Sequence, residues 1–129
     1  MEVLKFGQFE AMNNGIKKHM IDDFVVFQGK NADANDYLTM ELSTDNDIWM
    51  HAKGVPGSHV LIKVSDKLPT MEIIKKAAQI AADNSKGQSG QDMTVVYCKK
   101  KFVHKREGMN AGQVEVEYKN SDQIVVSKK

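Results

Sequence analysis

The sequence predicts an α+β fold in a single domain, with a mixed, mostly antiparallel sheet and two principal helices. Three observations predict it. Short runs rich in Val, Ile, Phe and Tyr recur along the chain, and other segments carry apolar residues at helical spacing. The strand-like runs gather toward the C-terminal end instead of alternating regularly with helices, which disfavours a repeating βαβ pattern. The 129 residues are enough for one hydrophobic core.

Six or seven strands are expected from these runs. They lie at residues 3–6, 24–27, 47–51, 60–64, 93–99, 113–118 and 123–127. The last two runs alternate apolar and polar residues and are separated by only four residues, which predicts a hairpin at the C-terminal end. The basic, glycine-containing residues 100–112 are expected to form a loop or a hairpin of their own.

Helical spacing of apolar residues occurs at residues 31–42, 71–84 and, interrupted by an Asn-Asn-Gly sequence, 9–21. The first two segments carry the signals of a helix start. Asn31 or Asp33 can cap one of them, and Thr70 can cap the other. The apolar residues of 71–84 form one stripe, as in a helix that packs on a sheet.

The composition is ordinary for a soluble globular protein, with 41% hydrophobic and 27% charged residues. No apolar run approaches the ~20 residues needed to cross a bilayer, and the first ten residues lack the apolar core of a signal peptide. The single cysteine, Cys98, cannot form an intramolecular disulfide. We therefore expect a cytoplasmic protein with no membrane partner.

The net charge of +1 hides an uneven distribution. Residues 51–106 carry eleven Lys or Arg against four Asp or Glu, whereas residues 1–50 carry four against nine. A basic middle third is a candidate contact surface for a polyanion. The alternative is a lysine-rich surface that faces only solvent.

Residues 47–60 hold the densest set of side chains that could bind a ligand. The turn between two strands contains Gly54, Pro56 and Gly57, and a glycine turn can present backbone N–H groups to an anion. Lys53 adds charge there, and Ser58 and His59 supply donors for phosphate or ribose oxygens.

The same segment contains the only tryptophan, Trp49, which could stack on a base or belong to the core. His51 and His59 could contact RNA or serve the fold. Their spacing of eight residues does not match a compact zinc motif. Ser58 and His59 are adjacent in the sequence, and adjacent side chains on a strand point to opposite faces, so the two do not have the arrangement of a nucleophile–base pair. We expect no catalytic residues, metal or cofactor.

Residues 98–106 form a second candidate segment, with five Lys or Arg, including Lys99, Lys101, Lys105 and Arg106. Such a run can bind phosphates by releasing counterions, or it can be a solvated loop. Phe102 could stack on a base or anchor the segment to the core. The strand position of Cys98 favours a buried, unreactive thiol.

A third segment, residues 29–36, joins a strand to a helix through Gly29, Lys30 and Asn31. A helix start of this kind can hold an anion, but a structural cap is the favoured interpretation because acidic residues follow.

Together these segments resemble the NFACT-R domain, the C-terminal RNA-binding module of the NFACT proteins of ribosome-associated quality control. The Gly-Arg/Lys-Asn/Asp-Ala-x-x-Asn pattern is matched by Gly29, Lys30, Asn31, Ala32 and Asn35. A strand followed by a Pro-Gly-Ser-His-Val turn is matched by Asp47, Ile48, Trp49, His51, Ala52, Pro56, Gly57, Ser58, His59 and Val60. Weaker matches are Ala77, Ala78, Ala81, Ala82, Val95, Val96, Tyr97, Val103, His104, Lys105, Gly108, Gly112 and Val114.

The resemblance implies RNA binding on or near the ribosome. Together with the basic run, it gives as candidate nucleic-acid-binding residues Lys30, Asn31, His51, Lys53, Gly57, Ser58, His59, Lys99, Lys101, Lys105 and Arg106. Long family members carry further domains and a coiled coil that do not fit in 129 residues, so their elongation of stalled nascent chains is not carried over. They are often labelled fibronectin-binding proteins, an activity that we do not expect here.

We therefore predict one NFACT-R-like domain over residues 1–129, with residues 1–23 as a candidate N-terminal extension. Its expected partner is tRNA or rRNA, with a ribosomal subunit as a further candidate, and it is expected not to be an enzyme. Two alternatives stay open: an accessory domain for tRNA modification, using Cys98 or the histidines, and a protein–protein adaptor on the ribosome. The sequence leaves the oligomeric state open.

Overall fold

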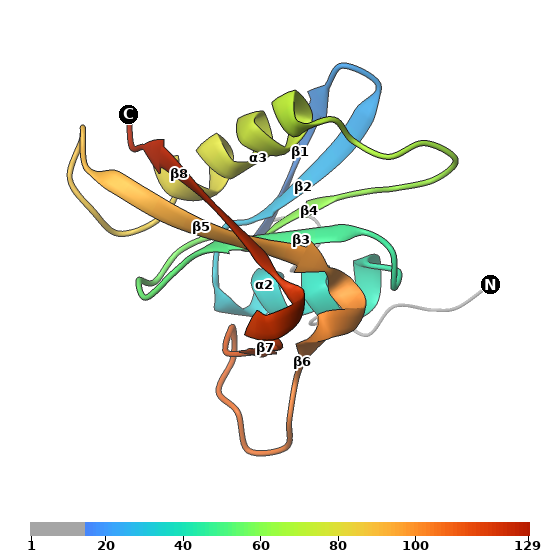
Figure 1. The fold of residues 1–129 in the computed structure, drawn as a ribbon. Helices are drawn as coiled ribbons and strands as arrows, with labels where there is room; N and C mark the ends of the chain where they lie inside the picture. The colour runs from blue at the N-terminus through green and yellow to red at the C-terminus, as the bar shows by residue number, and fades with distance from the viewer. Residues whose placement is uncertain (1–14) are drawn as a thin grey trace.

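The computed structural model describes residues 15–129. One antiparallel sheet separates two layers, with a long helix on one face and a short helix and a small hairpin on the other (Figure 1). The strands of this sheet are β1 (Ile16–Ile21), β2 (Phe24–Gly29), β3 (Ile48–Ala52), β4 (Val60–Ile62), β5 (Asp92–Lys99) and β8 (Asp122–Ser127). Their order is β1-β2-β4-β3-β5-β8, and every neighbouring pair is antiparallel. The α+β prediction is confirmed.

Helix α3 (Met71–Asp83) covers one face of the sheet. The Thr70 hydroxyl accepts a hydrogen bond from the Ile73 N–H at 3.3 Å, so the predicted cap is confirmed. Apolar residues at helical spacing give the helix one buried stripe. That stripe packs on Val26, Met50 and Val95 and their neighbours, which form the larger of two cores.

Helix α2 (Ala32–Tyr37) lies against the opposite face and continues into a π-helical turn, Leu38–Leu42. Asn31 is its cap, because the Asn31 side-chain oxygen accepts from the Ala34 N–H at 2.8 Å. The turn brings Leu38 into the smaller core with Trp49, Leu61 and Cys98.

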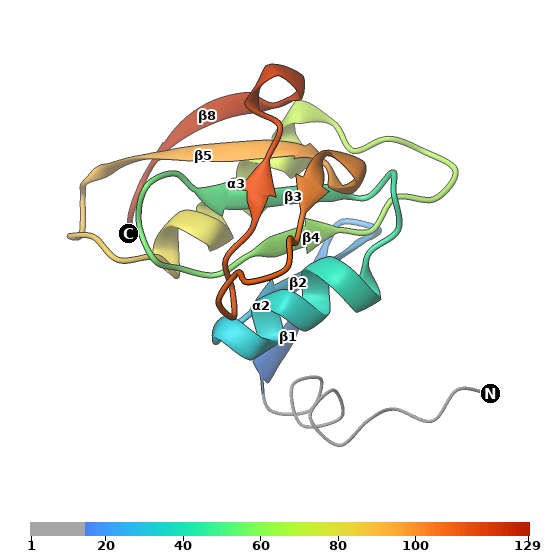
Figure 2. The same ribbon diagram turned by 90° about the horizontal axis from the view of Figure 1, so that it is seen from below.

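A two-stranded hairpin, β6 (Val103–His104) with β7 (Glu115–Val116), lies across this second face beside α2 (Figure 2). Short 3₁₀ turns precede it at Lys100–Phe102 and follow it at Tyr118–Asn120. Val103 and Val116 point into the smaller core, so the hairpin closes that core from outside.

The expected helix at residues 9–21 is wrong for its described part. Residues Ile16–Ile21 form β1, an edge strand paired with β2 over six residues. The pattern misled because Ile16, His19 and Ile21 are partly buried by neighbours far along the chain, and cross-strand pairing decided the conformation. The expected strand at 3–6 lies outside the described residues.

The expected C-terminal hairpin is also wrong. The strand β7 pairs with β6, and β8 pairs with β5. In this register β8 places Val126 opposite Met93 and Ile124 opposite Val95, under α3. Hydrophobic burial on the long strand therefore outweighs the short connection that favoured pairing β7 with β8.

Asp47 ties the start of β3 to the end of β4. Its carboxylate is fully buried and accepts hydrogen bonds from the N–H groups of Thr44 and Val64, both at 2.8 Å. It also pairs with the Lys63 ammonium at 2.5 Å. Three donors on one carboxylate fix the two strands next to each other.

Within the described chain, no helix is long and apolar enough to span a membrane.

Candidate functional site

The turn between β3 and β4 is packed against the end of α3. A Cβ on Gly57 would lie 2.0 Å from the Ser85 hydroxyl oxygen and 2.7 Å from the Ser85 Cα, so only glycine fits. The Ser58 N–H donates to the Asn84 carbonyl at 3.1 Å, and the Lys86 N–H donates to the Pro56 carbonyl at 2.8 Å. The glycine of this turn thus serves a close contact between two segments.

Asn35 of α2 holds the turn from the other side. Its side-chain oxygen accepts from the His59 N–H at 2.9 Å, and its amide donates to the Gly57 carbonyl at 3.2 Å. Gly29 allows this approach, because a Cβ there would lie 2.1 Å from the Asn35 side-chain oxygen. The motif of Gly29, Asn31 and Asn35 therefore caps α2 and positions the turn, in agreement with the favoured interpretation of that segment as a cap.

A buried polar chain continues from this turn. The Trp49 indole N–H donates to the Thr39 hydroxyl at 3.0 Å, and that hydroxyl lies 3.0 Å from His59 Nδ1. Because the indole can only donate, the Thr39 hydroxyl accepts that bond, and the same hydroxyl joins Trp49 to the His59 ring. The His59 ring is also held by hydrogen bonds to the backbone of Gly112 and Asn35.

The rings of Trp49, His51 and His59 form one cluster. The His59 ring centre lies 5.1 Å from each of the other two, in edge-to-face geometry. Burial lowers the pKa of His59 to about 3, and His51 adds to the lowering because two protonated rings would repel each other. Burial also lowers the pKa of His51, against a hydrogen bond to the Gly57 backbone. Both rings are therefore neutral near pH 7.

Ser58 and His59 are buried, with 6% and 2% of their surface exposed. The Ser58 hydroxyl accepts from the Gln28 amide at 3.3 Å, and His59 is engaged as described above. The polar side-chain atoms of Ser58 and His59, which the sequence suggested as donors to RNA, thus make hydrogen bonds inside the protein. Trp49 is 1% exposed and belongs to the core. Of the two interpretations that the sequence allowed for Trp49, base stacking and core packing, the structure supports core packing.

Three adjoining hollows line the surface around this turn, and we call them together the groove. The central hollow, about 370 Å³, shares His51, Pro56 and Gly112 with a second hollow of about 510 Å³. We call this second one the hairpin hollow, because residues 112–118 of the β6–β7 region form its wall. The third, also about 510 Å³, shares Lys30 and Ser58 with the central hollow and extends to Lys17 on β1.

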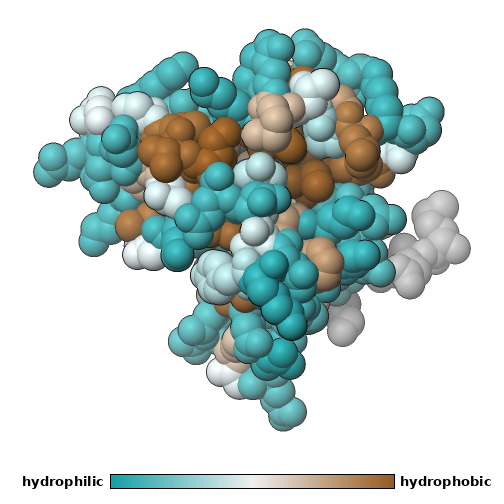
Figure 3. All heavy atoms as spheres, in the orientation of Figure 1, coloured by the Kyte–Doolittle hydropathy of each residue, from teal (hydrophilic) through white to brown (hydrophobic). Residues whose placement is uncertain are grey.

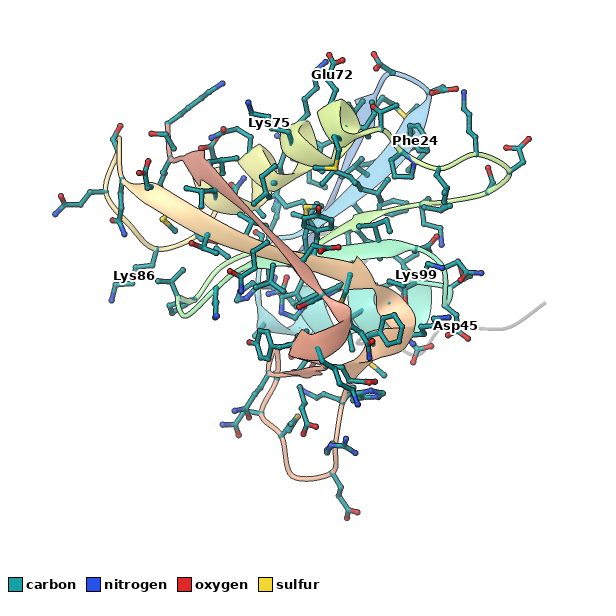
Figure 4. All side chains as sticks on the ribbon, in the orientation of Figure 1. Phe24, Asp45, Glu72, Lys75, Lys86 and Lys99 are labelled. Carbon is teal, nitrogen blue, oxygen red and sulfur yellow. The ribbon has the colours of Figure 1, made fainter. Side chains whose placement is uncertain are left out.

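The predicted cations divide into three groups. Lys30 and Lys53 line the groove, and they are exposed. Lys99 lies at the other end of β3, because it pairs with Ile48, whereas Lys53 follows Ala52. Figure 4 shows Lys99 beside Asp45, on the opposite side of the molecule from Lys86. Lys101 joins Lys99 there, since its N–H donates to the Asp45 carbonyl at 3.1 Å.

Lys105 and Arg106 are engaged by carboxylates. Lys105 lies 3.2 Å from the Asp36 carboxylate, and its ammonium also donates to the Asn110 and Gln113 carbonyls, so it closes the base of the 105–113 loop. Arg106 makes two hydrogen bonds to Glu115, at 2.8 and 3.0 Å. The eleven predicted residues therefore do not converge on one compact site.

Two groove residues were missed by sequence reasoning. Tyr118 is 56% exposed, and the Lys53 ammonium lies 5.3 Å from its ring centre. Lys17 reaches the groove because β1 is a strand next to β2. Neither residue stands in a motif, so only the fold places them there.

Cys98 is buried on β5, as expected, and burial raises the pKa of its thiol to about 11. Such a thiol is not a nucleophile near neutral pH. Among the residues described, no three His, Cys, Asp or Glu side chains are grouped so as to hold a metal ion.

The surface over the β6–β7 hairpin is mainly hydrophilic, and hydrophobic side chains gather over the upper part of the molecule (Figure 3).

Comparison with known proteins places this arrangement in a family. Residues 6–118 match the model of the NFACT protein RNA binding domain. The chain is 40% identical over 89 residues to the Rqc2 homolog RqcH of Bacillus subtilis, which covers 69% of this chain and 15% of that protein. It is 37% identical over 91 residues to the protein of the same name from Streptococcus suis, which covers 70% of this chain and 16% of that protein.

A solved structure has the same fold. It is the C-terminal part of the fibronectin/fibrinogen-binding protein from Streptococcus suis, with a TM-score of 0.82 and 26% identity, covering 100% of this chain and 49% of that one. The chain thus spans about one sixth of the length of the curated relatives that it matches. The family model covers most of the chain, from before β1 to Tyr118, so the chain belongs to the family of NFACT RNA-binding domains.

Proposed function

We propose that this domain binds structured RNA, tRNA or rRNA, through the groove, and that it does so in the cytoplasm in ribosome-associated quality control. The observation that carries the proposal is the set of lysines along the groove, Lys17, Lys30 and Lys53. None of the three makes a salt bridge within the described chain, so their charges are available to phosphates. The family description and the names of the relatives support the choice of RNA and of the ribosome.

One of the residues that line the groove is acidic. Asp83 lines the third hollow, but its carboxylate accepts from the Gln79 amide at 2.8 Å and from the Lys129 N–H at 2.9 Å. Lysines that neutralise phosphates release condensed counterions, so affinity falls as salt rises. The slope of affinity against salt therefore counts the phosphates contacted.

Titration of tRNA with the protein at several salt concentrations tests the proposal. We expect the unaltered protein to bind at low salt. We expect the double variant, Lys30→Ala with Lys53→Ala, to bind more weakly and to show a salt slope smaller by about 1.4–1.8. The matched control removes the same charge from α3, with Lys75→Ala and Lys76→Ala, and is expected to retain the slope. Absence of binding by the unaltered protein at low salt, to tRNA and to rRNA fragments alike, would contradict the proposal.

The ribosomal part of the proposal needs its own test. Co-sedimentation with ribosomes before and after RNase treatment distinguishes binding through RNA from docking on a ribosomal protein. Loss of association after treatment is expected. Association that persists would favour the adaptor alternative.

A further inference from the structure

The hairpin hollow is lined by more large aromatic and aliphatic side chains than the two neighbouring hollows. Its floor is formed by Trp49, His51 and Val96, and its outer wall by Val114 and Tyr118. Its volume of about 510 Å³ is within the range of roughly 300–1,000 Å³ that small-molecule sites show. The lining combines these aromatic and aliphatic side chains with polar ones such as His51 and Gln113, which suits a flat group with polar edges better than an ion.

The charges around this hollow lie at its rim. His51 is neutral near pH 7 because burial lowers its pKa, and His59 below it is neutral for the same reason. The rim holds Lys53, which is exposed and stands 5.3 Å from the Tyr118 ring centre. A phosphate inside the hollow would lose water without meeting a cation, whereas a phosphate at the rim would meet one.

We propose that the hairpin hollow takes one unpaired nucleobase of the bound RNA, with its face against Tyr118 and its phosphate beside Lys53. This inference rests on the proposed function, because it gives one subsite of the same groove. A base inside a helix cannot reach such a hollow, so the occupant comes from a loop, a bulge or a single-stranded end. Base–aromatic stacking tolerates any base, and the hollow then selects unpaired structure and not sequence.

The chain contains an internal control for this geometry. Lys101 stands 5.3 Å from the Phe102 ring centre, the same cation-over-ring arrangement as Lys53 and Tyr118. Phe102 packs on the smaller core, and neither Lys101 nor Phe102 lines the hairpin hollow. Comparing variants of the Lys53–Tyr118 pair with a variant of the Lys101–Phe102 pair therefore separates the effect of the hollow on binding from the effect of a surface cation.

The experiment uses the full chain and two RNA probes, a stem-loop with a single-stranded 3′ tail and a fully paired duplex with the same number of phosphates. Trp49, the only tryptophan, lines the floor of the hollow and reports its occupation by fluorescence. We expect a saturable change of Trp49 emission with the tailed RNA and none with the duplex. Tyr118→Ala is expected to weaken binding of the tailed RNA by roughly 5- to 150-fold, to abolish the emission change and to weaken duplex binding much less than tail binding.

Two further variants complete the test. Tyr118→Phe keeps the ring and is expected to restore binding of the tailed RNA, and Lys53→Ala is expected to weaken it more than Lys101→Ala does. If the unaltered protein binds both probes and Tyr118→Ala does not change the preference for the tail, the base subsite is wrong while RNA binding stands. If the unaltered protein binds neither probe, the proposed function fails together with the subsite.

Discussion

Residues 47–60 and residues 98–106 both stand out in the sequence, and the fold treats their functional side chains in opposite ways. In the first segment, Trp49, Ser58 and His59 are turned inward and engaged in hydrogen bonds. In the second, Lys99 and Lys101 stay on the surface, at the far end of β3 from the turn. The motif of the first segment therefore reflects close packing around the turn. The lysines available to a ligand, Lys17, Lys30 and Lys53, come from three separate segments.

The largest expected effect lies inside the first segment, at its buried carboxylate. Asp47→Ala removes the acceptor of two backbone N–H groups and leaves Lys63 without its partner, so we expect a loss of about 3–5 kcal/mol in the free energy of unfolding. Asp45→Ala, at an exposed carboxylate two residues earlier, is expected to stay within about 0.5 kcal/mol of the unaltered protein. Urea unfolding measures both, and equal stabilities would remove the claim that this segment is a packing motif.

The turn offers the next comparison, between two glycines three residues apart. Gly57→Ala places a Cβ against Ser85 and is expected to cost about 3 kcal/mol, because the contact includes the Ser85 backbone, which cannot move aside as a side chain could. Gly54 has a φ of +77° but open space around it, so Gly54→Ala should cost only about 1–2 kcal/mol from backbone strain. Thermal unfolding orders the two, and the reverse order would show that the turn needs flexibility more than close packing.

The buried histidine makes the same segment sensitive to acid. The pKa of His59 is lowered to about 3 in the folded protein, from about 6.5 in the unfolded chain. Below pH 6.5 the unfolded chain gains a proton that the folded protein refuses, so stability is lost as pH falls, by about 1.4 kcal/mol for each pH unit. Between pH 7 and pH 5 we expect a loss of about 2 kcal/mol from this group.

His59→Gln removes that proton, so its free energy of unfolding should depend less steeply on pH over the same interval. His51 acts in the same direction, because its pKa is also lowered, and leaves part of the slope in place. A variant with an unchanged slope would mean that His59 is solvated in the folded protein.

The smallest expected effect lies in the second segment and concerns binding. Lys101 forms no salt bridge within residues 15–129, whereas Arg106 is held by Glu115. We expect Lys101→Ala to lower the salt slope of tRNA binding by less than the about 0.7–0.9 expected for each groove lysine, and Arg106→Ala to lower it less still. If Lys101→Ala lowered the salt slope more than Lys53→Ala does, the RNA-binding surface would lie at this end of β3 and not in the groove.

Much of the fold could be predicted because local signals and tertiary packing agree. The caps at Asn31 and Thr70 and the apolar stripe of α3 are local, and they stand where the sequence puts them. The strand β1 and the pairing of β7 could not be predicted, since both depend on which distant strand is available. Local spacing carries no information about such partners.

The candidate site was predicted less completely for a related reason. Lys30, His51 and Lys53 do line the groove, but a sequence cannot tell an exposed hydroxyl or imidazole from a buried one, as Ser58 and His59 illustrate. Tyr118 enters the site only because the hairpin folds back over the sheet. A role in RNA binding remains a prediction for each of the eleven residues.

The β6–β7 hairpin is an excursion between two strands, β5 and β8, that pair directly with each other. Its base is closed by Lys105 and by the Gly112 N–H, both bound to the Asp36 carboxylate. The tip around Gly108 bends with a φ of +87° and meets open space. Each doubling of the length of a loop costs only about 0.6 kcal/mol. We therefore expect that residues inserted at this tip leave the strand pairing of the sheet unchanged. The domain thus carries a natural attachment point for a label, away from the strands that hold it together.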